Sequence, residues 1–285
     1  MERIVVIGGG LLGGSLALRL AEDRNVRLWA RRPESVGLAH SLGIHGATQD
    51  LSEAVEGAEL AVLGVPVGAM AGLAAKMIEA GLPASCLVTD VGSVKAVVHR
   101  EVAPVFAAAG ISFIGSHPMA GGEKQGMEAA RADLFEGAMC LLTDGEGIGA
   151  PRSTSLEAFW SELGCRTEWI SPEDHDRLVA RISHLPHVMA AATAKVALAN
   201  PAEARYGGGG LRDTTRVAGG HPAMWAEILL ENREAVGVAI AEARDFLGEI
   251  LASLDSGDHE TALRWLAEAC DLHASGRAVI QHECG

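Results

Sequence analysis

Short apolar runs alternate with helical patterns along the first half of the chain. The runs are continuous and bounded by glycine, proline or charged residues, as in strands buried on both faces, and they lie at 3–7, 26–30, 59–65, 86–90 and 111–114. Between them, apolar residues spaced three and four positions apart predict helices that begin near residue 14 and at 33–42, 51–55, 67–79 and 96–109. Strands that alternate with helices of this length predict an α/β domain built on a parallel, doubly wound sheet.

The pattern changes near residue 170. Two further apolar runs, at 138–143 and 167–170, enclose a helical segment at 154–163, and we expect both runs to extend the far edge of the sheet. Ser171-Pro172-Glu173-Asp174 then has the composition of a helix start, with a capping residue, a proline and two acids. Beyond it only helical patterns occur, at 172–199, 222–254 and 260–274. The sequence therefore predicts an α/β domain at 1–170 followed by an all-helical domain at 171–285.

Composition and charge exclude several classes of protein. Hydrophobic residues make up 48% of the 285 residues and charged residues 21%, which is typical of a globular protein without long disordered segments. The formal net charge of −14 argues against nucleic acid or an anionic membrane as a partner. The five cysteines are scattered without a CxxC pair, and no apolar run has the length of a signal peptide or a membrane span. We therefore expect a soluble, cytoplasmic protein with reduced thiols and no bound metal.

The turn after the first apolar run carries the glycine pattern of a dinucleotide site. Gly8, Gly10 and Gly13 form G-x-G-x-x-G between a predicted strand and a predicted helix, the context that this pattern requires. In such a turn the first glycine permits the sharp bend, the second lets a pyrophosphate approach the backbone, and the third lets helix and strand pack closely. The amides of Leu11 and Leu12 then face the phosphates from the helix N-terminus. The sequence therefore predicts a Rossmann-type, dinucleotide-binding domain.

The ends of two predicted strands refine this cofactor prediction. An NAD site has Asp or Glu after the second strand to bind the ribose hydroxyls, but this chain has Ala30 followed by Arg31 and Arg32. Guanidinium groups pair with a 2′-phosphate that a carboxylate would repel, so the sequence favours NADP over NAD. The alternative is that both arginines are solvated surface charges. Val65 and Pro66 close another strand, where the chain would pass over the cofactor.

Polar residues follow the ends of two more predicted strands. Asp90, Ser93 and Lys95 come after one strand, and His117 comes after the next. Ligands of such sheets bind beyond the carboxyl ends of the strands, so we expect these four side chains on one rim. The glycines around His117 predict a segment outside any regular element, where a histidine suits a proton acceptor. The simpler alternatives are a helix cap for Ser93, a surface charge for Lys95 and a loop histidine without a task for His117.

The predicted helical domain carries a second group of polar residues. His184 and His187 flank Pro186, which we expect to kink the long helix that begins at Pro172. Three roles are open for these histidines, namely contact with a substrate, structural hydrogen bonds, or binding of a metal ion. No third metal ligand of suitable spacing stands nearby in the sequence.

Four consecutive glycines precede a pair of arginines in the same domain. Arg212 and Arg216 stand four residues apart, on one face of a predicted helix, just after the glycines at 207–210. Guanidinium groups bind carboxylates through two parallel hydrogen bonds, so in an acidic chain this pair is a candidate carboxylate clamp. The alternative is an internal ion pair with Asp213 or a nearby glutamate.

Five motifs, in this order, resemble those of the prephenate/arogenate dehydrogenase family of tyrosine biosynthesis. They are Gly8-x-Gly10-x-x-Gly13, Asp90-x-Gly92-Ser93-x-Lys95, Gly115-Ser116-His117-Pro118-Met119-Ala120-Gly121, Ser183-His184-Leu185-Pro186-His187 and Gly209-Gly210-Leu211-Arg212-Asp213-Thr214-Thr215-Arg216. The resemblance covers essentially the whole chain, and the later motifs are far more specific than the glycine pattern. It implies a Rossmann domain followed by a helical dimerisation domain, and hence a homodimer. Many members have an acid where this chain has Ala30-Arg31-Arg32, which puts NAD in doubt here.

The resemblance also implies a reaction. This is the oxidative decarboxylation of prephenate, arogenate or both, to 4-hydroxyphenylpyruvate or tyrosine, with hydride transfer to NAD(P). His117 resembles the acceptor of the hydroxyl proton, and Ser93 resembles a hydrogen-bond partner that aligns the two groups. Five further residues resemble substrate-binding or gating positions: Arg216, His187, Arg212, His184 and Glu123. The preferred substrate, inhibition by tyrosine and the carboxylate that each arginine binds do not follow from the sequence.

Two other functions compete with this one. A β-hydroxyacid dehydrogenase also has a Rossmann domain followed by helices. Enzymes of that kind resemble one another in a catalytic lysine on the first long helix of the second domain, and Lys195 is the candidate for it here. A protein that senses NADP without catalysis has no need of a proton acceptor, so His117, Ser93 and Arg216 argue against it.

Overall fold

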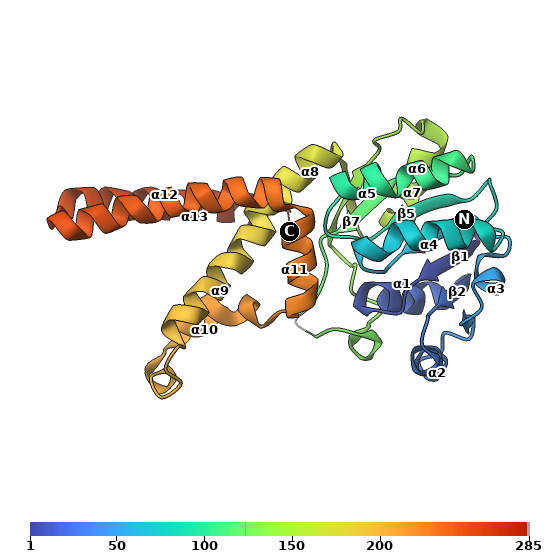
Figure 1. Ribbon diagram of the computed structural model, residues 1–285, viewed down its shortest axis with the longest axis horizontal. Helices are drawn as coiled ribbons and strands as arrows, with labels where there is room; N and C mark the ends of the chain where they lie inside the picture. Colours follow the sequence, from blue (N-terminus) through green and yellow to red (C-terminus); the bar gives the residue numbers. More distant parts are fainter. Residues whose placement is uncertain (123, 284–285) are drawn as a thin grey trace. The chain divides into compact units, whose positions relative to one another are not determined.

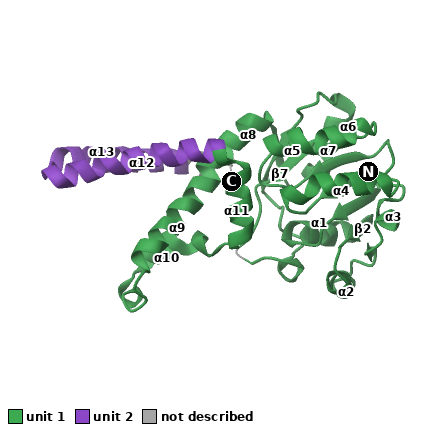
Figure 2. Ribbon diagram, viewed as in Figure 1, with its two compact units in different colours: residues 1–233 green, residues 234–285 purple. Residues whose placement is uncertain are grey.

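The computed structural model describes residues 1–122 and 124–283 (Figure 1). The prediction for Glu123 therefore lies outside the described residues. The chain forms two compact units, residues 1–233 and 234–285 (Figure 2). The predicted domain boundary near residue 170 lies inside the first unit and stays a prediction.

A six-stranded parallel sheet forms the centre of the first unit. Its strand order is β3-β2-β1-β4-β5-β6, and every neighbouring pair is parallel. The order reverses between β1 and β4, and in sheets of this kind ligands bind beyond the carboxyl ends at that point. The predicted doubly wound α/β fold is confirmed. The strands are β1 Arg3–Ile7, β2 Asn25–Trp29, β3 Ala47–Thr48, β4 Leu60–Leu63, β5 Leu87–Asp90 and β6 Ser112–Phe113.

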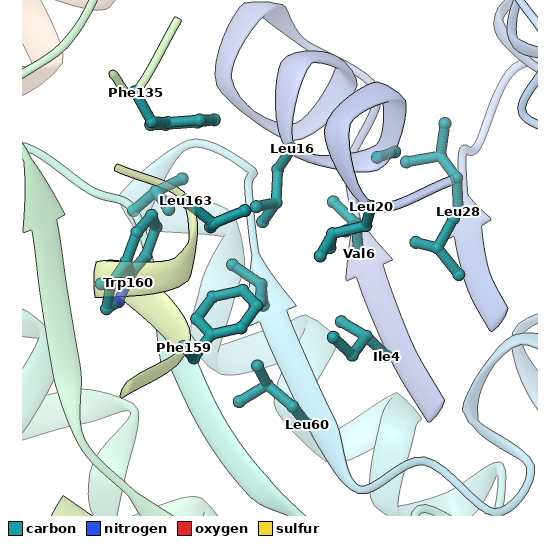
Figure 3. Close-up of a cluster of buried hydrophobic side chains, with 14 of the residues drawn as sticks. Ile4, Val6, Leu16, Leu20, Leu28, Leu60, Phe135, Phe159, Trp160 and Leu163 are labelled. Atoms are coloured by element: carbon teal, nitrogen blue, oxygen red, sulfur yellow. The ribbon is translucent and has the colours of Figure 1, made fainter. Parts of the chain in front are cut away.

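Successive residues of a strand point to opposite faces of the sheet. Because these strands are apolar on both faces, helices cover both. Ile4 and Val6 of β1 point into one core together with Trp160 (Figure 3). Val5 and Ile7 point into the other core. Burying one such side chain contributes about 1.5–3 kcal/mol. The first core lies under α1 Leu11–Ala21, α2 Pro33–Ser41 and α7 Ala150–Glu162, and the second lies under α3 Leu51–Val55, α4 Val67–Glu79, α5 Ala96–Glu101 and α6 Ala103–Ala108.

The runs that we expect at the edge of this sheet form a second sheet instead. Its order is β7-β8-β9, with β7 antiparallel to β8 and β8 parallel to β9. The prediction for the runs 138–143 and 167–170 is therefore wrong, because β8 pairs with β7, a strand that the sequence does not predict, and not with β6. The three strands are β7 Gly115–Pro118, β8 Met139–Thr143 and β9 Arg166–Trp169.

The segment around His117 is also more regular than its glycines predict. His117 lies within β7, opposite Leu141 of β8, and not outside regular structure. Gly115 permits close packing, because a Cβ on it would collide with the hydroxyl oxygen of Thr143. Pro118, which has no N–H to donate, is tolerated because β7 is an edge strand.

Side chains fasten β7 to the end of β5. The hydroxyl of Ser116 forms a hydrogen bond with that of Thr89 at 2.7 Å and accepts another from Trp160 Nε1 at 2.9 Å. The backbone N–H of Ser116 donates to Asp90 Oδ1 at 3.2 Å. Neighbouring residues of a strand point to opposite faces, so Ser116 is held among these groups while His117 points the other way.

The rest of the first unit is mainly helical, as its pattern predicts. The predicted interruption of the first long helix is a π-helical turn, Ala180–His184, just before Pro186. Such a turn shifts the hydrogen-bond pattern by one residue, which accommodates a residue without an N–H. The helices are α8 Pro172–Val179, α9 Leu185–Ala197, α10 Gly209–Thr215 and α11 Pro222–Glu231, and short 3₁₀ turns lie at Met127–Ala129, Ala204–Tyr206 and Arg216–Gly219.

The second unit contains two long helices, α12 Arg233–Ser256 and α13 His259–Glu283. A turn at Gly257, with a φ of +68°, joins them, and the Ser253 hydroxyl donates to the Asp258 carbonyl oxygen at 2.7 Å across it. Both helices expose large apolar side chains, among them Val238, Phe246, Leu251, Leu254, Leu263, Leu266 and Leu272. Within the described residues, no helix has both the length and the apolar character needed to cross a membrane.

Candidate active site

The turn between β1 and α1 has the shape that a dinucleotide requires. Gly8 has a φ of +115°, and a Cβ on it would lie 2.5 Å from the Gly64 carbonyl oxygen. A Cβ on Gly13 would collide with the carbonyl oxygen of Gly8, so helix and strand touch here. At Gly10, by contrast, no atom of the described residues outside Gly9–Leu11 and the adjacent helix backbone lies within 4 Å of the Cβ position. The backbone thus leaves room where a pyrophosphate must approach it.

The first turn of α1 completes this surface. The helix begins at Leu11, and Gly10 has no side chain to cap it. The backbone N–H groups of Leu11 and Leu12 therefore lack intrahelical acceptors and carry the positive end of the helix dipole. Such a terminus binds phosphate oxygens. The residues present fit a dinucleotide, which supplies a hydride acceptor when bound.

The residues predicted to cover and select the cofactor follow β4 and β2, the two neighbours of β1 in the sheet. Val65 follows β4 and lies against Gly8, since a Cβ on Gly8 would come within 2.7 Å of Val65 Cγ1. Pro66 is exposed and precedes α4. Arg31 and Arg32 follow β2 and are exposed, and in the described part of the chain neither guanidinium group has a hydrogen bond or ion pair. Both arginines are therefore accessible to a ligand.

His117 is the buried centre of the candidate site. It is 8% exposed, and its Nδ1 lies 2.8 Å from Nε2 of His175. Burial lowers the pKa of His117 well below its usual value, and electrostatic repulsion from the neighbouring Lys95 and from protonation of His175 or His184 opposes its protonation further. His117 is therefore neutral at physiological pH, which is the state that a proton acceptor needs.

Helix α8 contributes two buried residues next to His117, His175 and Asp176, that the sequence analysis misses. His175 Nδ1 lies 2.8 Å from Asp176 Oδ1, and both side chains are buried. Asp176 also accepts hydrogen bonds from the backbone N–H groups of Lys95 at 2.7 Å and Ala96 at 3.0 Å. Burial opposes ionisation of Asp176, but these hydrogen bonds outweigh it and hold the pKa of Asp176 below its usual value.

The sequence contains a weak signal that His175 and Asp176 are buried. Residues 172, 175, 176 and 179 are buried and have the spacing of one helical face. Histidine and aspartate in the middle of an inward stripe require partners, because unpaired buried polar groups are costly. The partner His117 lies 58 residues earlier, so the pattern of α8 alone does not identify it.

A buried ion pair shapes the loop after β5. Lys95 is fully buried, and its Nζ donates to Asp90 Oδ2 at 2.5 Å and to the Gly92 carbonyl oxygen at 2.9 Å. The alternative of a surface charge for Lys95 is therefore wrong. Ser93 is half-buried in this loop and does not cap the next helix, whose first N–H groups are bonded to Asp176 instead.

Two buried histidines and a half-buried tryptophan form a second group. His187 of α9 stacks on Trp225 of α11, with ring centres 3.6 Å apart, and His184 meets the edge of the same ring at 6.1 Å. Burial lowers the pKa of His184 to about 4, and its Nδ1 lies 3.2 Å from Asn232 Nδ2, which is a structural hydrogen bond. His187 Nδ1 is buried without a partner among the described residues, which suits contact with a ligand. The described residues contain no group of three potential metal ligands.

The predicted carboxylate clamp lies on exposed turns. Arg212, in the last turn of α10, is exposed, and its Nε lies 3.4 Å from Asp213 Oδ1. An ion pair between exposed groups contributes ~0–1 kcal/mol, so it does not prevent Arg212 from binding a ligand. Arg216 is also exposed and opens the 3₁₀ turn that follows α10. Both segments pack against α9, the helix that carries His187.

Two family models match consecutive parts of the chain. Residues 15–169 match the nucleotide-binding domain of prephenate dehydrogenase, and residues 171–268 match its dimerization domain. The chain belongs to the prephenate dehydrogenase family. The resemblance inferred from the five motifs is thereby confirmed, and the chain is an NAD(P)-dependent dehydrogenase.

Individual members of the prephenate dehydrogenase family resemble the chain over nearly its full length. Prephenate dehydrogenase from Bacillus subtilis (strain 168) is 30% identical over 278 residues, which are 95% of this chain and 75% of the relative. The crystal structure of prephenate dehydrogenase from A. aeolicus in complex with hydroxyphenyl propionate and NAD+ has a TM-score of 0.88 at 30% identity and covers 96% of this chain and 98% of that one. Arogenate dehydrogenase from Synechocystis has a TM-score of 0.80 at 28% identity, with 96% and 99% covered.

Proposed function

We propose that this chain oxidises and decarboxylates prephenate, arogenate or both, and that His117 accepts the proton of the substrate hydroxyl. The observation that carries the proposal is a buried, neutral histidine beside the carboxyl end of β5 in a dinucleotide-binding sheet. When hydride leaves a carbinol carbon, the hydroxyl proton must also leave, and an unprotonated imidazole accepts it. Assistance of this kind is worth ~10²–10⁴-fold in rate.

One proton acceptor suffices for the whole reaction. The hydroxyl O–H bond breaks and its proton binds Nε2 of His117, while hydride leaves the ring carbon for the cofactor and a carbonyl forms. The ring carboxylate then leaves as carbon dioxide, and its electron pair enters the ring, which becomes aromatic. The former carbonyl oxygen becomes a phenolate and takes the proton back from His117, so the histidine ends neutral.

Further residues position the substrate. Ser93, in the loop after β5, aligns the substrate hydroxyl with His117 through a hydrogen bond. Arg216 and Arg212 supply the positive charge that a substrate with carboxylates requires in a chain whose net charge is −14. His187 contacts the substrate through its unpaired Nδ1. His184 lies beside it against the same Trp225 ring.

The preferred cofactor in this proposal is NADP. Arg31 and Arg32 are accessible after β2, and no acidic residue occupies the position that binds the ribose hydroxyls in NAD enzymes. Two guanidinium groups next to the adenosine ribose favour a 2′-phosphate over a free hydroxyl.

The chain acts as a homodimer in this proposal. The support is the match to a dimerization domain together with the exposed leucines of α12 and α13. Large apolar side chains that contact water along two helices are stabilised when a second copy covers them.

The β-hydroxyacid dehydrogenase alternative depends on Lys195, which is exposed in the last turn of α9. It stands two helical turns beyond His187, about 12 Å along the helix axis. Lys195 is thus separated from the buried histidines. A test with Lys195→Ala and His117→Ala distinguishes the two functions, because only the second variant should lose activity.

The proposed function is tested with purified protein, both substrates and both cofactors. Reduced cofactor and carbon dioxide are expected in equal amounts with at least one substrate, since oxidation and decarboxylation are coupled. Absence of turnover with both substrates, or reduction of the cofactor without release of carbon dioxide, contradicts the proposal.

A further inference from the structure

A row of three buried side chains leads from His117 into the protein. Nδ1 of His117 lies 2.8 Å from Nε2 of His175, whose Nδ1 lies 2.8 Å from Oδ1 of Asp176. We propose that His175 and Asp176 are positioning residues that fix the ring proton of His117 on Nδ1, so that its Nε2 faces the substrate as a free acceptor. This inference rests on the proposed role of His117 as the base.

Asp176 determines which atoms of the row donate hydrogen bonds and which accept them. Its Oδ1 accepts from the backbone N–H of Lys95 at 2.7 Å, and its Oδ2 accepts from that of Ala96 at 3.0 Å. Backbone N–H groups only donate, so both oxygens act as acceptors, and these hydrogen bonds help to hold the pKa of Asp176 below its usual value and keep the carboxyl group ionised. An ionised carboxylate has no proton to give, so the hydrogen bond with His175 requires a proton on Nδ1 of that histidine.

The position of the proton on His175 in turn determines which nitrogen of His117 is protonated. Burial lowers the pKa of His175, so its ring is neutral and carries a single proton. That proton is on Nδ1, facing Asp176, which leaves Nε2 as an acceptor. The only hydrogen bond that His117 can then form with it is donation from its own Nδ1.

The opposite arrangement is disfavoured by geometry. If the proton of His117 were on Nε2, two ring nitrogens with lone pairs would face one another at 2.8 Å. Both lie in a buried region, where a polar group left without its hydrogen bond is costly. The row therefore selects the tautomer in which the reactive nitrogen is unprotonated before substrate binds.

The same row offsets the charge that the reaction creates. When Nε2 takes the substrate proton, His117 becomes a cation near Lys95, and Asp90 is already paired with that lysine. The charge of Asp176 reaches His117 through the single neutral ring of His175. The buried carboxylate of Asp176 thus stabilises the positive charge that forms on His117, because the low dielectric of this region strengthens their attraction.

The position of the proton is measured by nitrogen NMR of the full-length protein labelled at its histidines. Protonated and unprotonated ring nitrogens differ widely in chemical shift, and the signals missing from His117→Asn belong to His117. At mildly alkaline pH we expect Nδ1 of His117 protonated and Nε2 unprotonated. A protonated Nε2 in the wild type overturns the proposal, whether or not the protein turns over either substrate. Absent turnover would instead contradict the proposed function.

Two substitutions distinguish positioning from packing. His175→Gln places an amide oxygen near the former Nε2 and keeps an acceptor for His117, whereas His175→Leu has similar bulk but no acceptor. We expect kcat to fall on the order of 10²-fold in His175→Leu and to recover most of this loss in His175→Gln, with KM little changed in both. Equal losses in the two variants, or a change confined to KM, contradict the proposal. If His175→Leu does not fold, the wild-type spectrum still decides.

Discussion

An exposed histidine is partly protonated near neutral pH, because its pKa is ~6.5. His117 differs because it is buried and lies near groups that carry or acquire positive charge, and these conditions keep it neutral. A neutral ring is a competent base, but it must tolerate a positive charge when it accepts a proton. At the scale of single residues, the contact with His175 and Asp176 meets that need.

Cofactor preference is also set by single residues. In a variant with both Arg31→Ala and Arg32→Ala, kcat/KM with NADP should fall about ten- to a hundredfold while that with NAD changes little. One charge-assisted hydrogen bond to the 2′-phosphate is worth ~1.5–3 kcal/mol. Arg100→Ala, an exposed arginine of α5, is the control and should keep the wild-type preference. A wild type that prefers NAD is the result that rejects this assignment.

Substrate affinity should depend more on one arginine than on its neighbour. We expect Arg216→Ala to raise KM for the substrate about ten- to a hundredfold without weakening cofactor binding, since a charge–carboxylate contact is present in both ground and transition states. Arg212→Ala should have a smaller effect. Steady-state kinetics of both variants is the measurement. An unchanged KM in folded Arg216→Ala would leave that residue only a structural role.

The sequence predicts candidate residues better than it predicts their partners. His117 and the glycines stand in motifs whose chemistry is visible in a few consecutive positions. His175 and Asp176 come directly after a helix start whose capping pattern is complete without them, and their contact with His117 spans 58 residues. Lys95 has the sequence environment of a surface residue, and only the fold brings it against Asp90 in the interior.

At the scale of elements, the β1–α1 turn is packed so closely that it does not tolerate an added side-chain carbon at Gly13. Gly13→Ala should weaken NADP binding at least tenfold and lower the free energy of unfolding by about 1–3 kcal/mol, because its Cβ would collide with the Gly8 carbonyl oxygen. Gly37→Ala in α2 is the matched control. Apart from its chain neighbours and the backbone of its own helix, no described atom lies within 4 Å of its Cβ position, and alanine favours the helix by about 1 kcal/mol. Calorimetric binding and denaturant unfolding check both; equal behaviour of the two variants would contradict close packing at Gly13.

The elements differ in how far their sequences predict them. Strands of the parallel sheet are short runs of apolar residues between clear breaks, so their order along the chain is recognisable. β7 consists of Gly115, Ser116, His117 and Pro118, which are poor strand formers. It is a strand because it pairs with β8, and Ser116 is bonded to Thr89 and Trp160; no local pattern contains these contacts between distant segments.

At the scale of the whole molecule, the exposed leucines of the second unit are the basis of the proposed dimer. Leu254→Asp should weaken the proposed dimer on the order of 10²–10⁴-fold in Kd, because a leucine contributes ~1.5–3 kcal/mol and a twofold interface contains it twice. Ser256→Asp adds the same charge one half-turn further on an exposed polar position and should leave the dimer intact. Sedimentation equilibrium measures both. A monomeric wild type, or a Leu254→Asp variant as dimeric as the control, would contradict this role of α12.

The most direct test of the account is the pH dependence of kcat in wild type and His117→Asn. A base must be neutral to accept a proton, and burial lowers the pKa of His117. Wild-type kcat should therefore stay high down to pH values below ~6.5 and fall only as His117 becomes protonated. Asparagine keeps a hydrogen bond to the hydroxyl but accepts no proton, so kcat should drop ~10²-fold or more and lose this acidic limb, while both ligands still bind. A near-normal kcat with the same acidic limb would show that another residue is the base.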